Sequence, residues 1–367
     1  MGYEVGNLPL KTLLPAIGRA EDQLARLDEV VRRSPVGQGY AERAHFSEVA
    51  ASMWVAGELV HLEDLVLHDA ERDVRTPTHE ITIARSILGA RRRIASREAD
   101  WATSNSGIAS LTGKSPVESG GEASGAGREP SFEEVARNVE KDEFAAELAE
   151  IDAILDRSAR MLDAAEKRNG RLSDPLMIGE LVVRDPEWDE DGRLLAWRIV
   201  AEEVESLPVT LAAAVLWDAW EGLEPLERQH WLGAQLLNSY FRSREKVTSH
   251  LFCFSIGLKI IPRERRRSSS RIVRLQAALD GMANGAGVAM KEITRLGQAK
   301  DQLERKLRSK RSSSSLPGVV KLLMATPIVS ASMIVKELKV SHRAALDLVA
   351  ELGVREVTGS FRAWGII

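Results

Sequence analysis

The stretch SASMIVKELKVSHRAALDLVAELG, residues 330–353, decides how the C-terminal part of this chain folds. Ser330 and Ser341 each precede a short run in which apolar residues recur at three- and four-residue spacing, as in an amphipathic helix that begins with a serine cap. The stretch therefore predicts two helices, 331–338 and 342–352, joined by a turn of three or four residues. Gly353 is expected to end the second helix, because glycine is the usual residue just past a helix C-terminus.

Two short helices with a shared apolar seam and a tight turn between them are typical of a helix-turn-helix. The apolar run 317–325 precedes them, with a proline at its first turn, and predicts one more helix. Residues 354–364, VREVTGSFRAW, alternate apolar and polar positions around a Thr-Gly-Ser turn, which predicts a β-hairpin. A hairpin in this place is the wing of a winged-helix module, and its Arg355 and Arg362 could reach phosphates or a minor groove.

The N-terminal end of the third helix is the part that would enter a major groove, and it carries Ser341, His342 and Arg343. Arg343 suits a guanine contact and a phosphate contact equally well. Because the same helix also carries Asp347 and Glu351, we expect DNA affinity to depend on basic residues elsewhere. The alternative is a three-helix unit that docks on the rest of the chain, or on a second copy, without nucleic acid.

The formal net charge of −4 conceals an asymmetry along the chain. Residues 259–311 carry fifteen Lys or Arg and five Asp or Glu, a local charge of +10, and residues 312–367 add +2, which leaves −16 on residues 1–258. A basic C-terminal third attached to an acidic body indicates a phosphate-seeking surface. We expect the basic helix 291–311 to contribute to it, together with Arg263, Arg265, Arg266 and Arg267. A solvated basic helix face without any ligand explains the same charge.

The hydrophobic pattern divides the chain into five parts. We expect an N-terminal helical region over 1–103, a flexible linker over 104–130, a helical core over 131–258, a basic helical connector over 259–315, and the helix-turn-helix or winged-helix module over 316–367. Five of the eight tryptophans lie between residues 175 and 257, which favours a packed core over a ligand site. The fold class is therefore mainly α, with a multi-helix body before the C-terminal module.

Two segments of the body resemble Fic-type proteins. Residues 52–65, SMWVAGELVHLEDL, look like the Fic inhibitory helix, with Ser52 and Gly57 in place but Ala56 where the inhibitory glutamate stands. Residues 224–237, EPLERQHWLGAQLL, are distantly similar to the Fic core. There Glu224 replaces the catalytic histidine, and the glycines of the anion-binding turn are missing. The resemblance implies a degenerate Fic-like body that no longer transfers nucleotide, and Fic proteins frequently end in a winged-helix module.

The whole layout further resembles an uncharacterised bacterial family in which a domain of unknown function precedes a C-terminal helix-turn-helix. That resemblance implies DNA binding. We therefore expect a cytoplasmic bacterial protein that binds double-stranded DNA, a transcriptional regulator with a non-catalytic body, and we leave a homodimer open.

Two other readings stay open. One is an enzyme with residual or altered Fic-like nucleotidyl transfer that uses His230, and the other is a protein-protein interaction scaffold. No cofactor or metal is expected, because the seven histidines lack metal-ligand spacing and no phosphate-binding glycine motif occurs. No membrane segment is expected either, because no run of eighteen apolar residues exists.

Overall fold

The computed structural model describes residues 3–6, 8–70, 77–113, 188–307, 315–357 and 363–365. Three expectations lie outside these residues. They are most of the linker 104–130, the helical pattern at the start of the segment 131–258, and the turn of the predicted hairpin together with Arg362.

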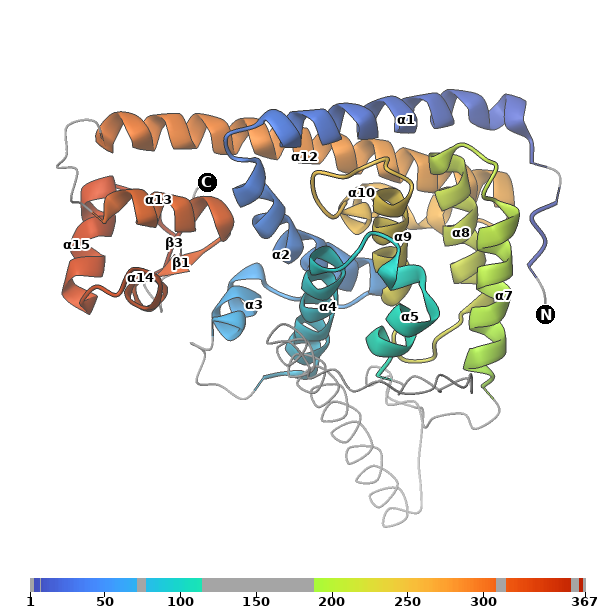
Figure 1. Cartoon of the computed structure of the whole chain (residues 1–367), viewed down its shortest axis with the longest axis horizontal. Coiled ribbons are helices and arrows are strands. Elements are labelled where there is room, and N and C mark those ends of the chain that lie inside the picture. Colours follow the sequence, from blue (N-terminus) through green and yellow to red (C-terminus); the bar gives the residue numbers. More distant parts are fainter. Residues whose placement is uncertain are drawn as a thin grey trace, which may run out of the picture.

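The described residues form a helical body and a small C-terminal module (Figure 1). The first part of the body contains α1 (Leu10–Arg33), α2 (Gly37–Ala56), α3 (Leu62–Asp69), α4 (His79–Ser96), the 3₁₀ helix η1 (Trp101–Thr103) and α5 (Asn105–Leu111). The second part contains α7 (Glu190–Glu203), α8 (Val209–Leu223), α9 (Leu232–Ser243), α10 (Phe254–Ile260), α11 (Arg263–Arg266) and α12 (Arg271–Leu307). The module contains α13 (Leu316–Ala325), β1 (Val329–Ser330), α14 (Ala331–Leu338), α15 (His342–Leu352), β2 (Arg355–Glu356) and β3 (Ala363–Gly365). The chain is thus mainly α, as predicted.

The longest helix, α12, forms the spine of the body, and α1 packs along it (Figure 1). Its apolar residues at three- and four-residue spacing make a buried stripe that includes Leu275, Leu279, Met282, Ile293 and Leu296. Where α10 crosses this helix, a Cβ on Gly257 would lie 1.8 Å from the carbonyl oxygen of Gly281, so the close approach requires glycine. Most of the segment 259–315, expected as a connector, is therefore the central helix of the core.

The tryptophans divide into two groups. Trp197 of α7 and Trp220 of α8 are buried and meet edge to face, with 5.5 Å between ring centroids. Their indole N–H groups donate to the carbonyl oxygens of Leu216 and His230, each at 3.0 Å, so both polar tips are satisfied in the core. The predicted tryptophan core is confirmed for these two residues, whereas Trp217 and Trp231 are only half-buried and line a cavity.

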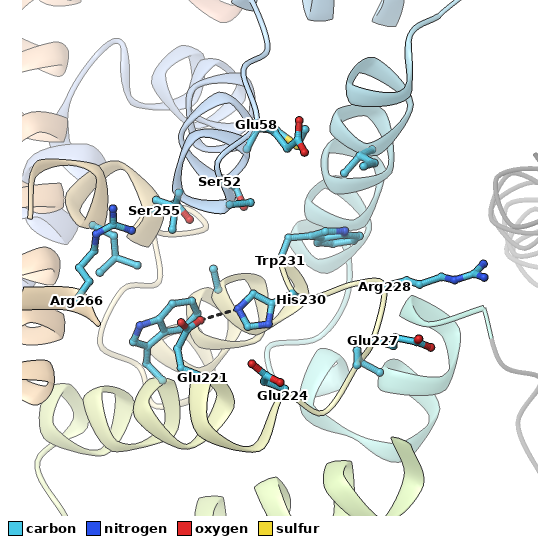
Figure 2. Close-up of a pocket in the computed structure, with 18 of the residues that line it drawn as sticks. Ser52, Glu58, Glu221, Glu224, Glu227, Arg228, His230, Trp231, Ser255 and Arg266 are labelled. Atoms are coloured by element: carbon cyan, nitrogen blue, oxygen red, sulfur yellow. Dashed lines mark hydrogen bonds and ion pairs between the residues drawn. The ribbon is translucent and has the colours of Figure 1, made fainter. Parts of the chain in front are cut away.

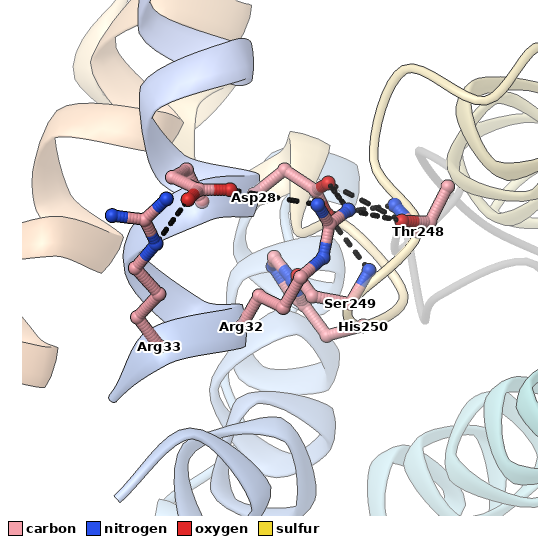
Figure 3. Close-up of polar contacts among 7 residues, drawn as sticks. Asp28, Arg32, Arg33, Thr248, Ser249 and His250 are labelled. Carbon is pink, nitrogen blue, oxygen red and sulfur yellow. Dashed lines mark hydrogen bonds and ion pairs between the residues drawn. The ribbon is translucent and has the colours of Figure 1, made fainter. Parts of the chain in front are cut away.

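A carboxylate of α1 holds the loop between α9 and α10 in place (Figure 3). Asp28 accepts hydrogen bonds from the backbone N–H groups of Thr248 and Ser249, both at 2.7 Å. Burial alone would raise the pKa of Asp28, but these hydrogen bonds outweigh it and the pKa is lowered. The next residue, His250, is buried edge-on against Tyr40, and desolvation lowers its pKa to about 4.

The expected linker begins with a helix that belongs to the core. Ser104 accepts a hydrogen bond from the N–H of Gly107 at 3.0 Å and so caps α5. Ile108 and Leu111 of this short helix are buried. The low overall hydrophobicity of 104–130 hid these two apolar residues, so the expectation of a linker from residue 104 onward is corrected here. Within the described ranges, no helix is long and apolar enough to cross a membrane.

Candidate functional site

The two helices of the helix-turn-helix begin and end at the residues that the sequence predicted, and α13 begins one residue earlier than predicted. Ser330 accepts a hydrogen bond from the N–H of Met333 at 3.3 Å, and Ser341 accepts one from the N–H of Ala344 at 3.2 Å. The turn between α14 and α15 contains Lys339 in the left-handed region, at φ 54°, and Gly353 ends α15 in the same region. These caps fix a helix-turn-helix with a three-residue turn.

The three helices of the module share a small core. Ile334 of α14 and Ala345 of α15 are fully buried, and Val319 of α13 lies in the same cluster. A Cβ on Gly318 would lie 2.4 Å from a methyl carbon of Leu338, which shows how closely α13 and α14 pack. The predicted apolar seam is therefore confirmed.

A three-stranded antiparallel sheet in the order β1-β3-β2 closes the module. Glu356 of β2 pairs with Trp364 of β3, and Val329 of β1 pairs with Trp364 on its other side. The two strands predicted after α15 are thus present and antiparallel. Residues 358–362, which contain their connecting turn and Arg362, fall outside the described residues.

The N-terminal end of α15 faces solvent. Ser341, His342 and Arg343 are all exposed, and so is Arg355 on β2. Arg343 makes no hydrogen bond or ion pair within the part of the chain that the structure describes. The first turn of a helix also presents unpaired backbone N–H groups and the positive end of the helix dipole. This end of α15 is therefore available to a phosphate or a base edge.

The arginines around α11 do not join this surface. They precede α12, whereas the module follows it, and a helix of 37 residues is about 55 Å long. Arg265 forms an ion pair with Asp280 of α12 at 2.8 Å. Arg266 donates to the carbonyl oxygen of Ile261 at 3.1 Å and lies over the Trp54 ring. Arg263 and Arg267 are exposed. Sequence reasoning counted all four toward one phosphate-seeking surface with the module, because it could not see that Arg265 and Arg266 have partners within the body.

The two Fic-like segments meet at one cavity of about 470 Å³ in the body (Figure 2). Ser52 and Ala56 of α2 line it, and so do Glu224 and His230 from the turn after α8. Nε2 of His230 lies 2.8 Å from Oε1 of Glu221 on α8. This hydrogen bond raises the pKa of His230 against the opposing effect of burial. The pairing was not foreseen, because it depends on the path of the turn between α8 and α9.

Comparison with known proteins identifies the family. Over the full length of both chains, the sequence is 43% identical to "Uncharacterized protein y4cF" of Sinorhizobium fredii. Residues 182–308 match the family model described as "Protein of unknown function (DUF1612)". The chain belongs to the DUF1612 family. Residues 316–367 match a second model, described as "HTH DNA binding domain", which covers α13 to β3. The predicted layout, a domain of unknown function followed by a helix-turn-helix DNA-binding domain, is thereby confirmed.

Arg43 of α2 attaches the helix-turn-helix domain to the body. Its guanidinium is buried and donates to the carbonyl oxygens of Leu323 at 3.3 Å and Thr326 at 2.7 Å, at the C-terminal end of α13. Its Nε lies 3.2 Å from Oε1 of Glu292 on α12, within the DUF1612 domain. A cation at a helix C-terminus is favourable, because the carbonyl groups there carry partial negative charge.

An apolar contact adds to this polar one. Ile328 and Ala363 of the helix-turn-helix domain are buried in one cluster with Phe46, Val49 and Met53 of α2, and Met333 of α14 packs against it. The domain is thus docked through α13, the sheet and one face of α14, and this docking leaves the N-terminal end of α15 in solvent. No sequence signal pointed to Arg43, because its partners lie about 250 to 280 positions away.

Proposed function

We propose that this protein is a transcriptional regulator that binds double-stranded DNA through α15. One observation carries the proposal: the N-terminal end of α15 is exposed and its Arg343 has no partner among the described residues, in a helix-turn-helix domain that packs on the body through other elements. In this motif the N-terminal residues of the second helix contact base edges. The body holds the domain in a fixed orientation.

The proposed mode of binding consists of three kinds of contact. Arg343 reaches a guanine edge or a phosphate, Ser341 and His342 add hydrogen bonds, and the backbone N–H groups of the first turn of α15 bind a phosphate. Arg355 on β2 contacts the flanking backbone, as the wing of a winged-helix domain does. Two copies on a two-fold-symmetric site would place their recognition helices about 34 Å apart, one turn of DNA.

We further propose that the body does not catalyse a reaction. Glu224 stands where the Fic resemblance implies a catalytic histidine, and the adjoining turn lacks the glycines that would cradle a diphosphate.

Selection of bound fragments from a genomic DNA library, followed by salt titration, tests the DNA-binding proposal. The affinity should fall steeply between about 50 and 200 mM salt, because phosphate contacts release counterions. Arg343→Ala should weaken binding about 10- to 100-fold, the loss expected for one good base contact. Arg26→Ala, an exposed arginine on α1, is the matched control and should bind like the wild type. No binding at low salt, or equal losses for both variants, would contradict the proposal.

A second candidate function is Fic-like nucleotidyl transfer by His230. The observation that favours it is the meeting of both Fic-like segments at one cavity, beside a histidine that is hydrogen-bonded to a carboxylate. Such a pair can take a proton from an attacking hydroxyl group while pyrophosphate leaves the nucleotide. Incubation with labelled ATP and Mg²⁺ tests it. Label on the protein or on an added acceptor, lost in His230→Ala, supports transfer, whereas no label supports a non-catalytic body.

A further inference from the structure

Four charged residues that line the cavity of Figure 2, Arg266, Arg267, Glu58 and Glu224, form no ion pair with one another. Arg266 uses Nε on a backbone carbonyl, and its two Nη atoms have no hydrogen-bond partner among the described residues. Arg267 lines the same wall and is exposed. Across the cavity, the carboxylates of Glu58 and Glu224 accept no hydrogen bond from the described residues. Figure 2 shows Arg266 and Glu224 on opposite sides of the Glu221–His230 pair.

The remaining wall of the cavity is apolar. Trp217, Trp231 and Leu226 line it, beside Met53 of α2. A volume of about 470 Å³ lies in the range of small-molecule sites, roughly 300–1,000 Å³, and such sites combine apolar walls with a few placed polar groups. The cavity therefore fits a small molecule with a large apolar or aromatic part.

The charge pattern selects the class of ligand. Glu221 and His230 pair with each other, and Glu227 and Arg228, which also line the cavity, have partners of their own. The charges left for a ligand are therefore Arg266 and Arg267 on one side and Glu58 and Glu224 on the other. A simple anion would meet Glu58 and Glu224, and a simple cation would meet Arg266 and Arg267, each with like charges unpaired in a partly desolvated site. A zwitterion whose two charges are several bonds apart can pair with both sets.

The cavity is also connected to the DNA-binding domain. Met53 and Trp231 line the cavity, and both belong to or pack against the apolar cluster that contains Ile328 and Ala363 of the helix-turn-helix domain. Met333 of α14 packs on the same cluster. In addition, α2 carries Ser52 and Met53 at its cavity end and Arg43 at its other end, where Arg43 holds α13. A ligand that moves Trp231 or the end of α2 acts on the contacts that orient the domain.

We propose that this cavity binds a small zwitterion of the ω-amino-acid type, with an aromatic or large apolar part between its two charges, and that its binding changes the DNA affinity of the helix-turn-helix domain. The second half of this inference rests on the proposed function. The ligand's carboxylate pairs with Arg266 and Arg267, its ammonium group pairs with Glu224, and its apolar part packs on Trp217 and Trp231.

The binding half is tested on the full chain without DNA. Three amino acids whose charges are separated by an apolar spacer, 4-(aminomethyl)phenylacetate, 3-(4-aminomethylphenyl)propanoate and 6-aminohexanoate, are titrated by calorimetry, each beside its analogue without the amino group and its analogue without the carboxylate. At least one amino acid should bind, and both of its analogues should bind at least about tenfold more weakly, which corresponds to about 1.4 kcal/mol. Failure of all three amino acids at about 10 mM, near the limit of weak but specific binding, overturns the proposal, and so does an analogue that binds as well as its parent.

Charge variants assign the binding to this cavity. Arg267→Ala and Glu224→Gln should each weaken binding at least about fivefold, because each leaves one charge of the ligand unpaired. Arg263→Ala is the matched control, since Arg263 lies on the same segment but does not line this cavity. Equal effects of Arg263→Ala and Arg267→Ala place the ligand elsewhere and overturn the assignment.

The coupling half is tested by measuring DNA affinity with and without the amino acid that binds. We expect a change of about 5- to 150-fold, and by linkage the same factor in the ligand's affinity when DNA is bound. Met333→Ala should keep ligand binding and reduce this factor, whereas Met333→Leu should preserve it. Ligand binding without any change in DNA affinity overturns the coupling. If no DNA is bound with or without the ligand, the proposed function is wrong. The calorimetric titration without DNA still tests whether the cavity binds the ligand.

Discussion

The arginines of the module and those of the body behave in opposite ways. Arg343 projects into solvent from a domain whose formal charge is close to neutral. The more basic segment, 259–311, directs several of its arginines into the protein, where Arg265 pairs with Asp280 and Arg274 pairs with the buried Asp218 at 2.5 Å. Carboxylates of the acidic part and of the segment itself therefore neutralise some of these arginines within the protein. A charge count along the sequence measures how much charge is present, and only the fold shows how much of it remains for a partner.

The largest effect should come from an inward-facing arginine. Arg43→Ala should lower the free energy of unfolding by about 2–3 kcal/mol, because it leaves the carbonyl groups at the end of α13 without their buried donor, while Glu292 keeps Arg295 at 2.7 Å. Denaturant titration measures this loss, and the double variant with Glu292→Ala shows how much of it comes from the pair. A loss below about 1 kcal/mol, as for a surface pair, would mean that Arg43 does not hold the domain.

A smaller effect should come from lowering the pH, and it should originate in the body. His250 has its pKa lowered to about 4 by desolvation, so between pH 4 and its ordinary pKa near 6.5 the unfolded chain binds a proton that the folded chain does not. The free energy of unfolding therefore keeps the full contribution of the neutral His250 above about pH 6.5. It should fall by about 2 kcal/mol when the pH is lowered to 5.

Denaturant midpoints at several pH values check this prediction. The variant His250→Gln should flatten the profile, and His342→Gln, which changes the exposed histidine of the module, should leave it unchanged. Identical profiles for His250→Gln and the wild type would show that His250 does not cause the loss.

An outward-facing arginine of the module should affect DNA binding and leave stability unchanged. Arg355→Ala should reduce the salt dependence of DNA affinity by about one phosphate contact and weaken binding by roughly 1 kcal/mol. The neighbouring Glu356→Gln is the matched control, because it removes a negative charge from the same exposed strand and should strengthen binding slightly. If the salt dependence of DNA affinity is unchanged in Arg355→Ala, β2 does not contact the DNA backbone.

The smallest effect should come from Arg265. Its ion pair with Asp280 is partly exposed, and Asp280 keeps a second partner in Arg19 at 2.9 Å. Arg265→Ala should therefore lower stability by less than about 1 kcal/mol. DNA affinity should stay within about twofold of the wild type, because Arg265 is held by Asp280 of α12 and is not part of the helix-turn-helix domain. A tenfold loss of DNA affinity in Arg265→Ala would show that Arg265 belongs to the DNA-binding surface. Arg265 and Arg343 would then not differ in their contribution to DNA binding.

Local sequence signals predicted the module well, whereas long-range contacts escaped them. Ser330, Ser341 and Gly353 mark helix ends through hydrogen bonds and backbone angles within a few residues, so the sequence placed α14 and α15 correctly. The partners of Arg43, Arg265 and His230 depend instead on how helices pack, which no local pattern contains. For the same reason α12 was taken for a connector, because its many charges concealed a buried stripe that only the partner helices reveal.

The most direct test compares DNA affinity for Arg343→Ala and Arg265→Ala on one selected genomic fragment, at the same salt concentration, beside the wild type. The account predicts that Arg343→Ala binds about 10- to 100-fold more weakly, while Arg265→Ala binds within about twofold of the wild type. Equal affinities for the two variants, or a larger loss in Arg265→Ala, would contradict the claim that α15 reads DNA while the arginines of the body stabilise the fold.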